Sequence, residues 1–154
     1  MQNCDICVHL QNDSGQIAKT DHWVVSLAPD QGYLGRCYVT LRKHKGSLAD
    51  LSEEEWADYA KVVRKLEHSV VKVFNAVPSN WACMMNNAYQ KKPSNPHVHW
   101  HFRPRYFTPQ TIRGVTFEDP LYGHHYDRNQ RRDIDSQTFQ LICKMLKDTF
   151  ALEG

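Results

Sequence analysis

The stretch His97-Val98-His99-Trp100-His101-Phe102 is the most informative part of this 154-residue chain, because three imidazoles alternate there with three bulky apolar side chains. The two-residue period of a β-strand predicts that all three histidines lie on one face, with the apolar residues in the core beneath. Successive imidazoles would then start roughly 6.6 Å apart, twice the ~3.3 Å rise of a strand. Such a face is costly to hold unless a negative group or a metal lies against it, so it is the first candidate for a functional site.

The remaining patterns predict an α+β domain built on an antiparallel sheet. Strand-like segments occur at 16–20, 23–27 and 37–41, and the turn residues Pro29, Gly32 and Gly35 precede the third of them. These segments favour an antiparallel meander, and a further strand is expected at 81–85, before the one that starts at His97.

Two helices are expected from apolar periodicity. Ser52 and Glu55 form a capping-box pattern, after which apolar residues recur at steps of three and four. The predicted core face of this long helix consists of Trp56, Tyr59, Val63, Leu66, Val70 and Val73. The segment 135–150 predicts a second helix by the same spacing, whereas 107–132 is rich in turns and gives no assignment.

Composition narrows the class of protein. The chain has 41% hydrophobic and 23% charged residues and a formal net charge of +2, which is no large excess of either sign. This balance argues against a non-specific nucleic-acid binder, and no apolar stretch approaches the ~20 residues of a membrane helix. Without a signal-peptide pattern, we expect a cytoplasmic protein. Its five cysteines, an odd number, are expected to be reduced.

The histidine face admits two chemical interpretations. Two or three imidazoles on a strand could bind a catalytic zinc, as in a metallohydrolase. Alternatively, one neutral imidazole is a nucleophile toward phosphorus while its neighbours neutralise the phosphate. Ser94, Arg103 and Arg105 favour the second interpretation, because a hydroxyl and two guanidinium groups suit phosphate oxygens. The segment also lacks a carboxylate that could serve a zinc-bound water as general base.

Cys4 and Cys7 form a Cys-x-x-Cys pair, which is half of a tetrahedral zinc site by its spacing. The spacing alone is weak evidence. A redox dithiol or two unrelated thiols would together be at least as frequent.

The stretch from His97 resembles the motif His-φ-His-φ-His-φ-φ, with φ apolar, of the histidine-triad (HIT) nucleotide hydrolases and transferases. The resemblance extends from Cys4 to about Tyr106. It implies a HIT-like fold, a homodimer, and a covalent nucleotidyl-histidine formed by attack of His99 on a nucleoside 5′-phosphoryl group. The substrate would be a dinucleoside polyphosphate or an adenylated small molecule. The other residues that the resemblance implies are His101 and Ser94 at the phosphate, Asn86 or its neighbour Asn87 at the nucleotide, and Arg105 in the Pro-Arg ending of the motif.

The resemblance is also to a zinc-containing branch, in which the Cys-x-x-Cys pair joins two histidines. It implies a structural Zn²⁺ held by Cys4, Cys7, His44 and His97. The chain departs from the common pattern at Lys92-Pro93, where many relatives have Gly-Gln, and at Arg103, which replaces an apolar residue. The acidic residue that usually contacts the ribose is displaced as well, with Asp30 nearby.

We therefore expect a catalytic domain over 1–106, with the extension 107–154 packed on it. The expected function is nucleotide hydrolysis or nucleotidyl transfer, without membrane or nucleic-acid partners. The alternatives are a non-catalytic nucleotide sensor or scaffold, and a histidine-based metallohydrolase.

Overall fold

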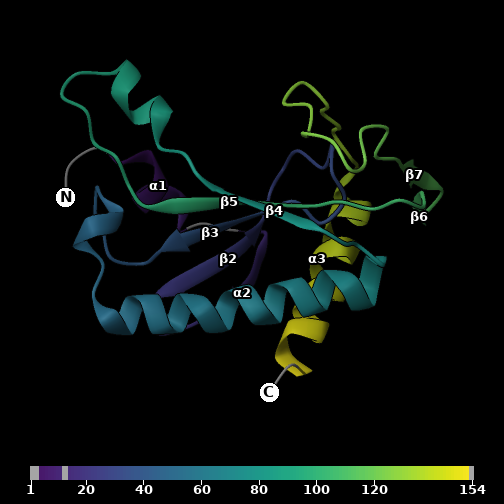
Figure 1. Ribbon diagram of the computed structural model, residues 1–154, viewed down its shortest axis with the longest axis horizontal. Helices are drawn as coiled ribbons and strands as arrows, with labels where there is room; N and C mark the ends of the chain where they lie inside the picture. The colour runs from purple at the N-terminus through teal and green to yellow at the C-terminus, as the bar shows by residue number, and fades with distance from the viewer. Residues whose placement is uncertain (1–3, 12–13, 153–154) are drawn as a thin grey trace.

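The computed structural model describes residues 4–11 and 14–152, so the outer bounds of the two predicted segments, 1 and 154, lie outside the described part of the chain. A five-stranded antiparallel sheet forms the centre of the molecule, with strand order β1-β2-β3-β5-β4 (Figure 1). Its strands are β1 (Gln16–Lys19), β2 (Trp23–Leu27), β3 (Cys37–Leu41), β4 (Ser79–Cys83) and β5 (His99–Pro104).

The register of β3 against β5 separates the two faces of the sheet. Val39 lies opposite Trp100, and Tyr38 lies opposite His101. Because neighbouring side chains of a strand point to opposite faces, Trp100 shares the apolar face while Tyr38 and His101 share the other.

Helix α2 (Glu53–Phe74) covers the apolar face of the sheet. Its first turn is closed by a capping box, in which the Glu55 carboxylate accepts from the Ser52 amide at 2.7 Å and the Ser52 hydroxyl accepts from the Glu55 amide at 3.3 Å. The helix ends at Asn75, which adopts the left-handed conformation. The Tyr59 ring stacks on Trp100 with centroids 5.0 Å apart, so the long helix and the triad strand share one aromatic core.

The remaining elements surround this centre. A short helix α1 (Asp5–His9) precedes the sheet, and the one-turn helices η1 (Leu48–Asp50) and η2 (Asn86–Gln90) lie in loops. After β5 the chain forms the hairpin β6 (Gln110–Ile112) and β7 (Val115–Phe117) and then helix α3 (Ser136–Leu152), which contacts α2 and β1. None of the helices in the described segments is both long and apolar enough to cross a membrane.

Three local predictions were wrong. The strand expected from His97 begins at His99, and the one expected at 81–85 runs from Ser79 to Cys83. Trp56 is 39% exposed instead of lying in the core. The buried face of α2 differs from the predicted one because it includes Glu55 and Asp58. Asp58 accepts hydrogen bonds from the Thr20 hydroxyl at 2.7 Å and from the His22 amide at 2.9 Å.

Candidate active site and metal cluster

His97 lies just before β5, and its side chain turns away from the other two triad histidines. It is buried beside His44, with ring centroids 4.9 Å apart. The regular β5 ladder starts only at His99, while the backbone of Val98 bonds to Leu41 and Lys45. The triad is therefore divided between two sites, one around His97 and one around His99 and His101.

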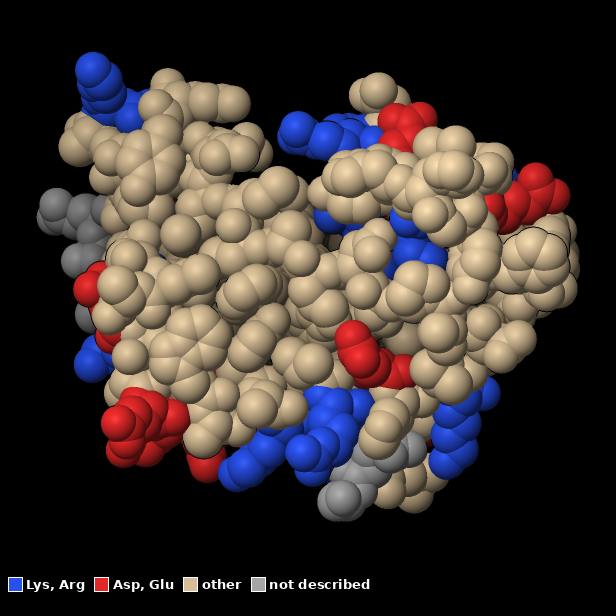
Figure 2. All heavy atoms as spheres, viewed as in Figure 1, with Lys and Arg blue, Asp and Glu red and all other residues tan. Residues whose placement is uncertain are grey.

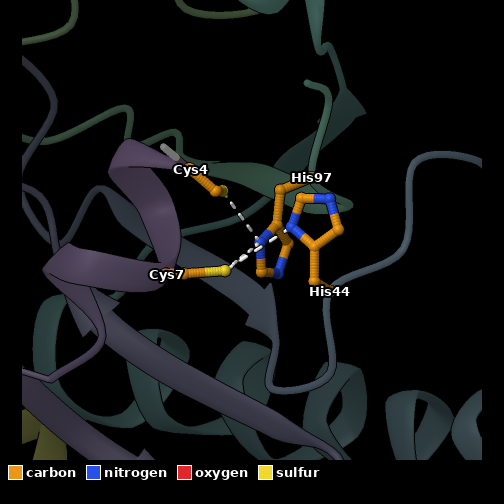
Figure 3. A group of neighbouring side chains, drawn as sticks. All are labelled: Cys4, Cys7, His44 and His97. Atoms are coloured by element: carbon orange, nitrogen blue, oxygen red, sulfur yellow. Dashed lines mark hydrogen bonds between the residues drawn. The ribbon is translucent and has the colours of Figure 1, made fainter. Parts of the chain in front are cut away.

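The first site, which we call the Cys2His2 cluster, consists of Cys4, Cys7, His44 and His97 (Figure 3). The Nδ1 atom of His97 is 3.4 Å from the Cys4 sulfur and 3.3 Å from the Cys7 sulfur, and the Cys7 sulfur is 3.5 Å from the His44 Nδ1. All four donor atoms lie within 4.8 Å of one another. Zn–S bonds of about 2.3 Å and Zn–N bonds of about 2.0 Å place the ligands of a tetrahedral site about 3.5 Å apart. The donors fit a zinc ion.

The tautomer of His97 also suits metal binding. Its Nε2 lies 2.7 Å from the Leu41 carbonyl oxygen. Since a carbonyl can only accept, Nε2 carries the proton and the lone pair of Nδ1 faces the two sulfurs. Burial lowers the pKa of His97, although the Leu41 hydrogen bond opposes this, so the neutral form needed for a ligand is favoured.

The second site, which we call the triad face, lies on the side of the sheet opposite α2. The rings of His99 and His101 are tilted against each other with centroids 5.0 Å apart. The His99 Nδ1 lies 2.8 Å from the backbone oxygen of His97. That oxygen can only accept, so Nδ1 carries a proton, and in the neutral tautomer the lone pair is on the Nε2 of His99.

His101 is held neutral by its surroundings. Burial, followed by the charges of His99, Arg103 and Arg36, lowers the pKa of His101 from 6.5 to about 4, against a backbone hydrogen bond at Met84. Its Nδ1 atom is buried and has no hydrogen-bond partner among the described residues. A neutral imidazole with an unpartnered nitrogen is suited to contact a substrate oxygen.

Three residues of the triad face have no signature in the sequence. The Tyr38 ring makes edge contacts with His101 at 5.3 Å and with His99 at 6.4 Å between centroids. The Arg36 guanidinium donates to the Tyr38 hydroxyl at 3.3 Å, and Tyr126, from the extension, lies under Arg103. Only the alternation of Tyr38 with the buried Cys37 and Val39 could have placed it beside the histidines.

The comparisons agree with this geometry. The family model named HIT domain matches residues 9–108. The chain belongs to the HIT family.

Solved structures share the HIT fold at low sequence identity. A hypothetical histidine-triad nucleotide-binding protein from Sulfolobus tokodaii is 16% identical, with 97% of this chain and 93% of that chain covered and a TM-score of 0.68. A zinc-bound histidine-triad family protein from Mycobacterium smegmatis is 20% identical, with coverages of 97% and 94% and a TM-score of 0.66. A HIT-like protein from Bartonella henselae, described as involved in cell-cycle regulation, is 19% identical, with coverages of 97% and 98% and a TM-score of 0.68. No curated protein matches the sequence.

Arg105 follows the HIT motif, and its guanidinium binds groups of the protein itself. It makes a bidentate ion pair with Asp119, at 2.6 Å and 2.9 Å. Its other donors reach the Asn80 side chain and the backbone oxygens of Leu121 and His124 at 2.7–3.1 Å. All five N–H donors of the guanidinium are thus engaged within the protein. Instead of supporting the predicted phosphate contact, this geometry ties the extension to the HIT domain.

The predicted phosphate and nucleotide residues Ser94 and Asn86 lie in the loop between β4 and β5. Asn86 begins η2 and Ser94 follows it, and both side chains are exposed. Neither hydrogen-bonds with His99 or His101 in the described structure, so their predicted roles stay predictions. The loop leaves the sheet where β4 ends and returns where β5 begins, which places it at the end of the sheet nearest His99.

Proposed function

We propose that this HIT protein is a nucleotide hydrolase or nucleotidyltransferase that acts through a covalent nucleotidyl-histidine on His99. The observation that carries the proposal is the 2.8 Å contact between the His99 Nδ1 and the His97 backbone oxygen. A nucleophilic imidazole needs an unprotonated nitrogen, and in the neutral ring this contact assigns the proton to Nδ1 and the lone pair to Nε2.

The reaction is a double displacement at a nucleoside 5′-phosphoryl group. The His99 Nε2 forms a bond to phosphorus while the bond from phosphorus to the leaving group breaks, and the leaving group departs with the electron pair and later gains a proton. Water or another acceptor then attacks the same phosphorus, loses its proton, and releases the Nε2 atom. A dinucleoside polyphosphate or an adenylated small molecule would supply such a bond.

The neighbouring groups stabilise the phosphoryl oxygens. His101 is neutral at pH 7 and donates or accepts without adding a charge that would compete with the nucleophile. We assign Ser94 and Asn86 to the phosphate and nucleotide as the loop settles on the substrate. Arg105 is left out of this set because its donors are already engaged.

We assign a structural Zn²⁺ to the Cys2His2 cluster. Four protein donors would complete a tetrahedral site and leave no position for a catalytic water. The ion would fix the backbone of His97, whose oxygen orients the nucleophile. The mechanism needs no metal contact with the substrate, which separates it from a metallohydrolase.

The experiment is a search for the covalent adduct. Wild-type protein is mixed briefly with a nucleotide labelled at the 5′-phosphorus and quenched in alkali, and the modified peptide is located by mass spectrometry. We expect label on His99 and none in the His99→Ala variant. Binding of nucleotide without any adduct or turnover would indicate a sensor or scaffold instead, and prompt inhibition by a chelator without labelled protein would indicate a metallohydrolase.

Two further parts of the proposal concern the setting of the protein. Family membership supports a homodimer, which light scattering of the purified chain would test. The five free cysteines, two of them in the cluster, suit a reducing compartment such as the cytoplasm.

A further inference from the structure

Arg103 is a buried cation without an acidic partner. It is 7% exposed and stands where the HIT motif has an apolar residue, and its guanidinium forms neither an ion pair nor a hydrogen bond with the described residues. Its guanidinium instead lies over the Tyr126 ring, 4.3 Å from the centroid. Arginine is almost never buried unless it is paired, so an uncompensated guanidinium here calls for an anionic partner from outside the chain.

The guanidinium of Arg36 lies near that of Arg103. Cys37 lies opposite Phe102 in the sheet, so Arg36 follows the ladder to the level of Arg103. Arg36 pairs with Asp30 at 2.5 Å, but its buried Nε atom has no hydrogen-bond partner in the described structure. Burial and the Arg36 charge both lower the pKa of Arg103, as expected for a desolvated cation beside a second one.

The position of this pair relates it to the reacting centre. Arg103 follows His101 by two residues on β5, so it lies on the same face about 6.6 Å further along the strand. The surface in Figure 2 is hollowed at its upper edge, between the η2 loop and the segment that joins β7 to α3, and Lys and Arg atoms are visible in the recess. Tyr126, which belongs to that segment, contacts the Arg103 guanidinium with its ring.

We propose that Arg36 and Arg103 form a second anion subsite beside the imidazole pair, which binds a negatively charged group of the substrate other than the phosphoryl group under attack. Planar guanidinium groups bind phosphate and carboxylate oxygens in bidentate geometry, and both would compensate the unpaired charge. The subsite rests on the proposed function, since it extends that substrate by one anionic group. It selects substrates with two neighbouring anions over those with one.

Binding of inorganic anions tests the subsite without assuming a base or a leaving group. Calorimetry is performed with pyrophosphate and with phosphate on wild-type protein, Arg103→Leu, Arg103→Lys and the control Arg64→Leu, which removes an exposed arginine from α2. We expect wild type and Arg64→Leu to bind pyrophosphate at least about tenfold more tightly than phosphate. Arg103→Leu should lose this preference, and Arg103→Lys, which keeps the charge without the fork, should retain about a third of it.

Two pairs of nucleotides show whether the bound anion is a phosphate or a carboxylate. Adenosine diphosphate against adenosine monophosphate tests a second phosphate, and the adenosine phosphoramidates of glycine and glycinamide test a carboxylate. An Arg103-dependent preference for the anionic member of either pair supports the subsite and names its ligand. Equal preferences in wild type, Arg103→Lys and Arg103→Leu would overturn it.

A labelling control separates this outcome from a failure of the proposed function. Wild-type protein should form the His99 adduct with a nucleotide that lacks a second anion. If that adduct forms normally but no Arg103-dependent preference exists, the subsite is wrong and the nucleophile stands. If no adduct forms in wild type, the proposed function is wrong, while the pyrophosphate measurement still judges the subsite.

Discussion

The Cys2His2 cluster and the triad face both include histidines of one short segment, yet their buried polar atoms differ in whether they have hydrogen-bond partners. In the cluster, both nitrogens of His97 have partners, one at Leu41 and one at the two sulfurs. On the triad face, the Nδ1 of His101 is buried with no partner in the described structure. Saturated groups hold a shape, whereas unsaturated buried groups cost stability and persist where a ligand completes them.

The same contrast recurs at the other end of β5, between two arginines separated by one proline. Arg105 has an acceptor for each of its five donors, whereas Arg103 has an aromatic ring and a second cation. Fully partnered groups thus flank β5, with His97 before it and Arg105 after it, and polar groups without a hydrogen-bond partner in the described structure lie between them. This division yields predictions that differ in kind as well as size.

The largest effect is expected on the open side. His99→Ala should lower turnover by roughly 10⁴-fold, about 5.5 kcal/mol in barrier, because the bond to phosphorus cannot form. His101→Ala should leave measurable activity, with a loss of about 10²-fold, because it removes one contact to the phosphate. Steady-state kinetics on both variants and on His124→Ala, an exposed histidine of the extension, measure this. Near-normal turnover of His99→Ala would erase the distinction between the two sites.

A stability effect is expected at the saturated end of the strand. Arg105→Leu should lower the free energy of unfolding by about 4 kcal/mol, because it leaves the Asp119 carboxylate buried and unpaired. Urea unfolding measures the loss, and Arg128→Leu, an exposed arginine of the same extension, is the matched control. The double variant Arg105→Leu/Asp119→Leu should recover part of the loss, since no buried charge remains. If Arg105→Leu unfolds like Arg128→Leu, the saturated network does not stabilise the extension.

These differences mark where sequence reasoning succeeds. Alternating residues and the capping box predicted the sheet and α2, because each pattern reports a local preference for one backbone conformation. The gathering of Cys4, Cys7, His44 and His97 was predicted only through the family resemblance, since Cys-x-x-Cys spacing also suits a redox pair. The structure brings these donors together.

The errors have a common physical source. The contacts of His97 depend on Cys4, Cys7 and His44, which lie far from it in the sequence, rather than on the His-x-His pattern. Arg103 and Arg105 have equal chemistry, and what separates them is Asp119, in a turn-rich segment without periodicity. Trp56 is exposed, whereas Glu55 and Asp58 are buried. Their burial depends on Lys45 and Thr20, which lie outside the helix and its pattern.

Metal removal tests whether the Cys2His2 cluster holds a structural zinc ion that does not contact the substrate. Purified protein should contain about one zinc per chain, and Cys7→Ser should lose it together with about 3 kcal/mol of stability, or roughly 6–12 °C in Tm. Cys83→Ser, a half-buried thiol outside the cluster, should keep its zinc. A chelator present only during a short assay should barely change the rate, because the ion does not contact substrate. Rapid loss of activity that added metal restores would instead place the metal on the reacting side.

The smallest effect concerns the ion pair that joins the cluster to α2. Lys45, which follows His44 of the cluster, donates to the Glu55 carboxylate at 2.6 Å. Burial raises the pKa of Glu55, but the Lys45 and Ser52 hydrogen bonds outweigh it and hold that pKa below 4.5. A carboxylate with a lowered pKa stabilises the fold above its unfolded pKa, and this contribution is lost as the pH falls through the folded value.

Glu55→Gln isolates that charge, because glutamine can still accept from the Ser52 amide and keep the capping box. We expect the variant to be less stable than wild type by about 1 kcal/mol at pH 7, and the difference should shrink as the pH falls below 4.5, toward the protonated carboxyl. Urea unfolding across this range measures the difference, with Glu53→Gln, an exposed residue of the same helical turn, as the control. Zinc loss in acid affects wild type and both variants alike and cancels in the comparison. A difference between Glu55→Gln and wild type that is independent of pH would mean that the pair contributes shape and packing, and that its charge does not tie the cluster to the helix.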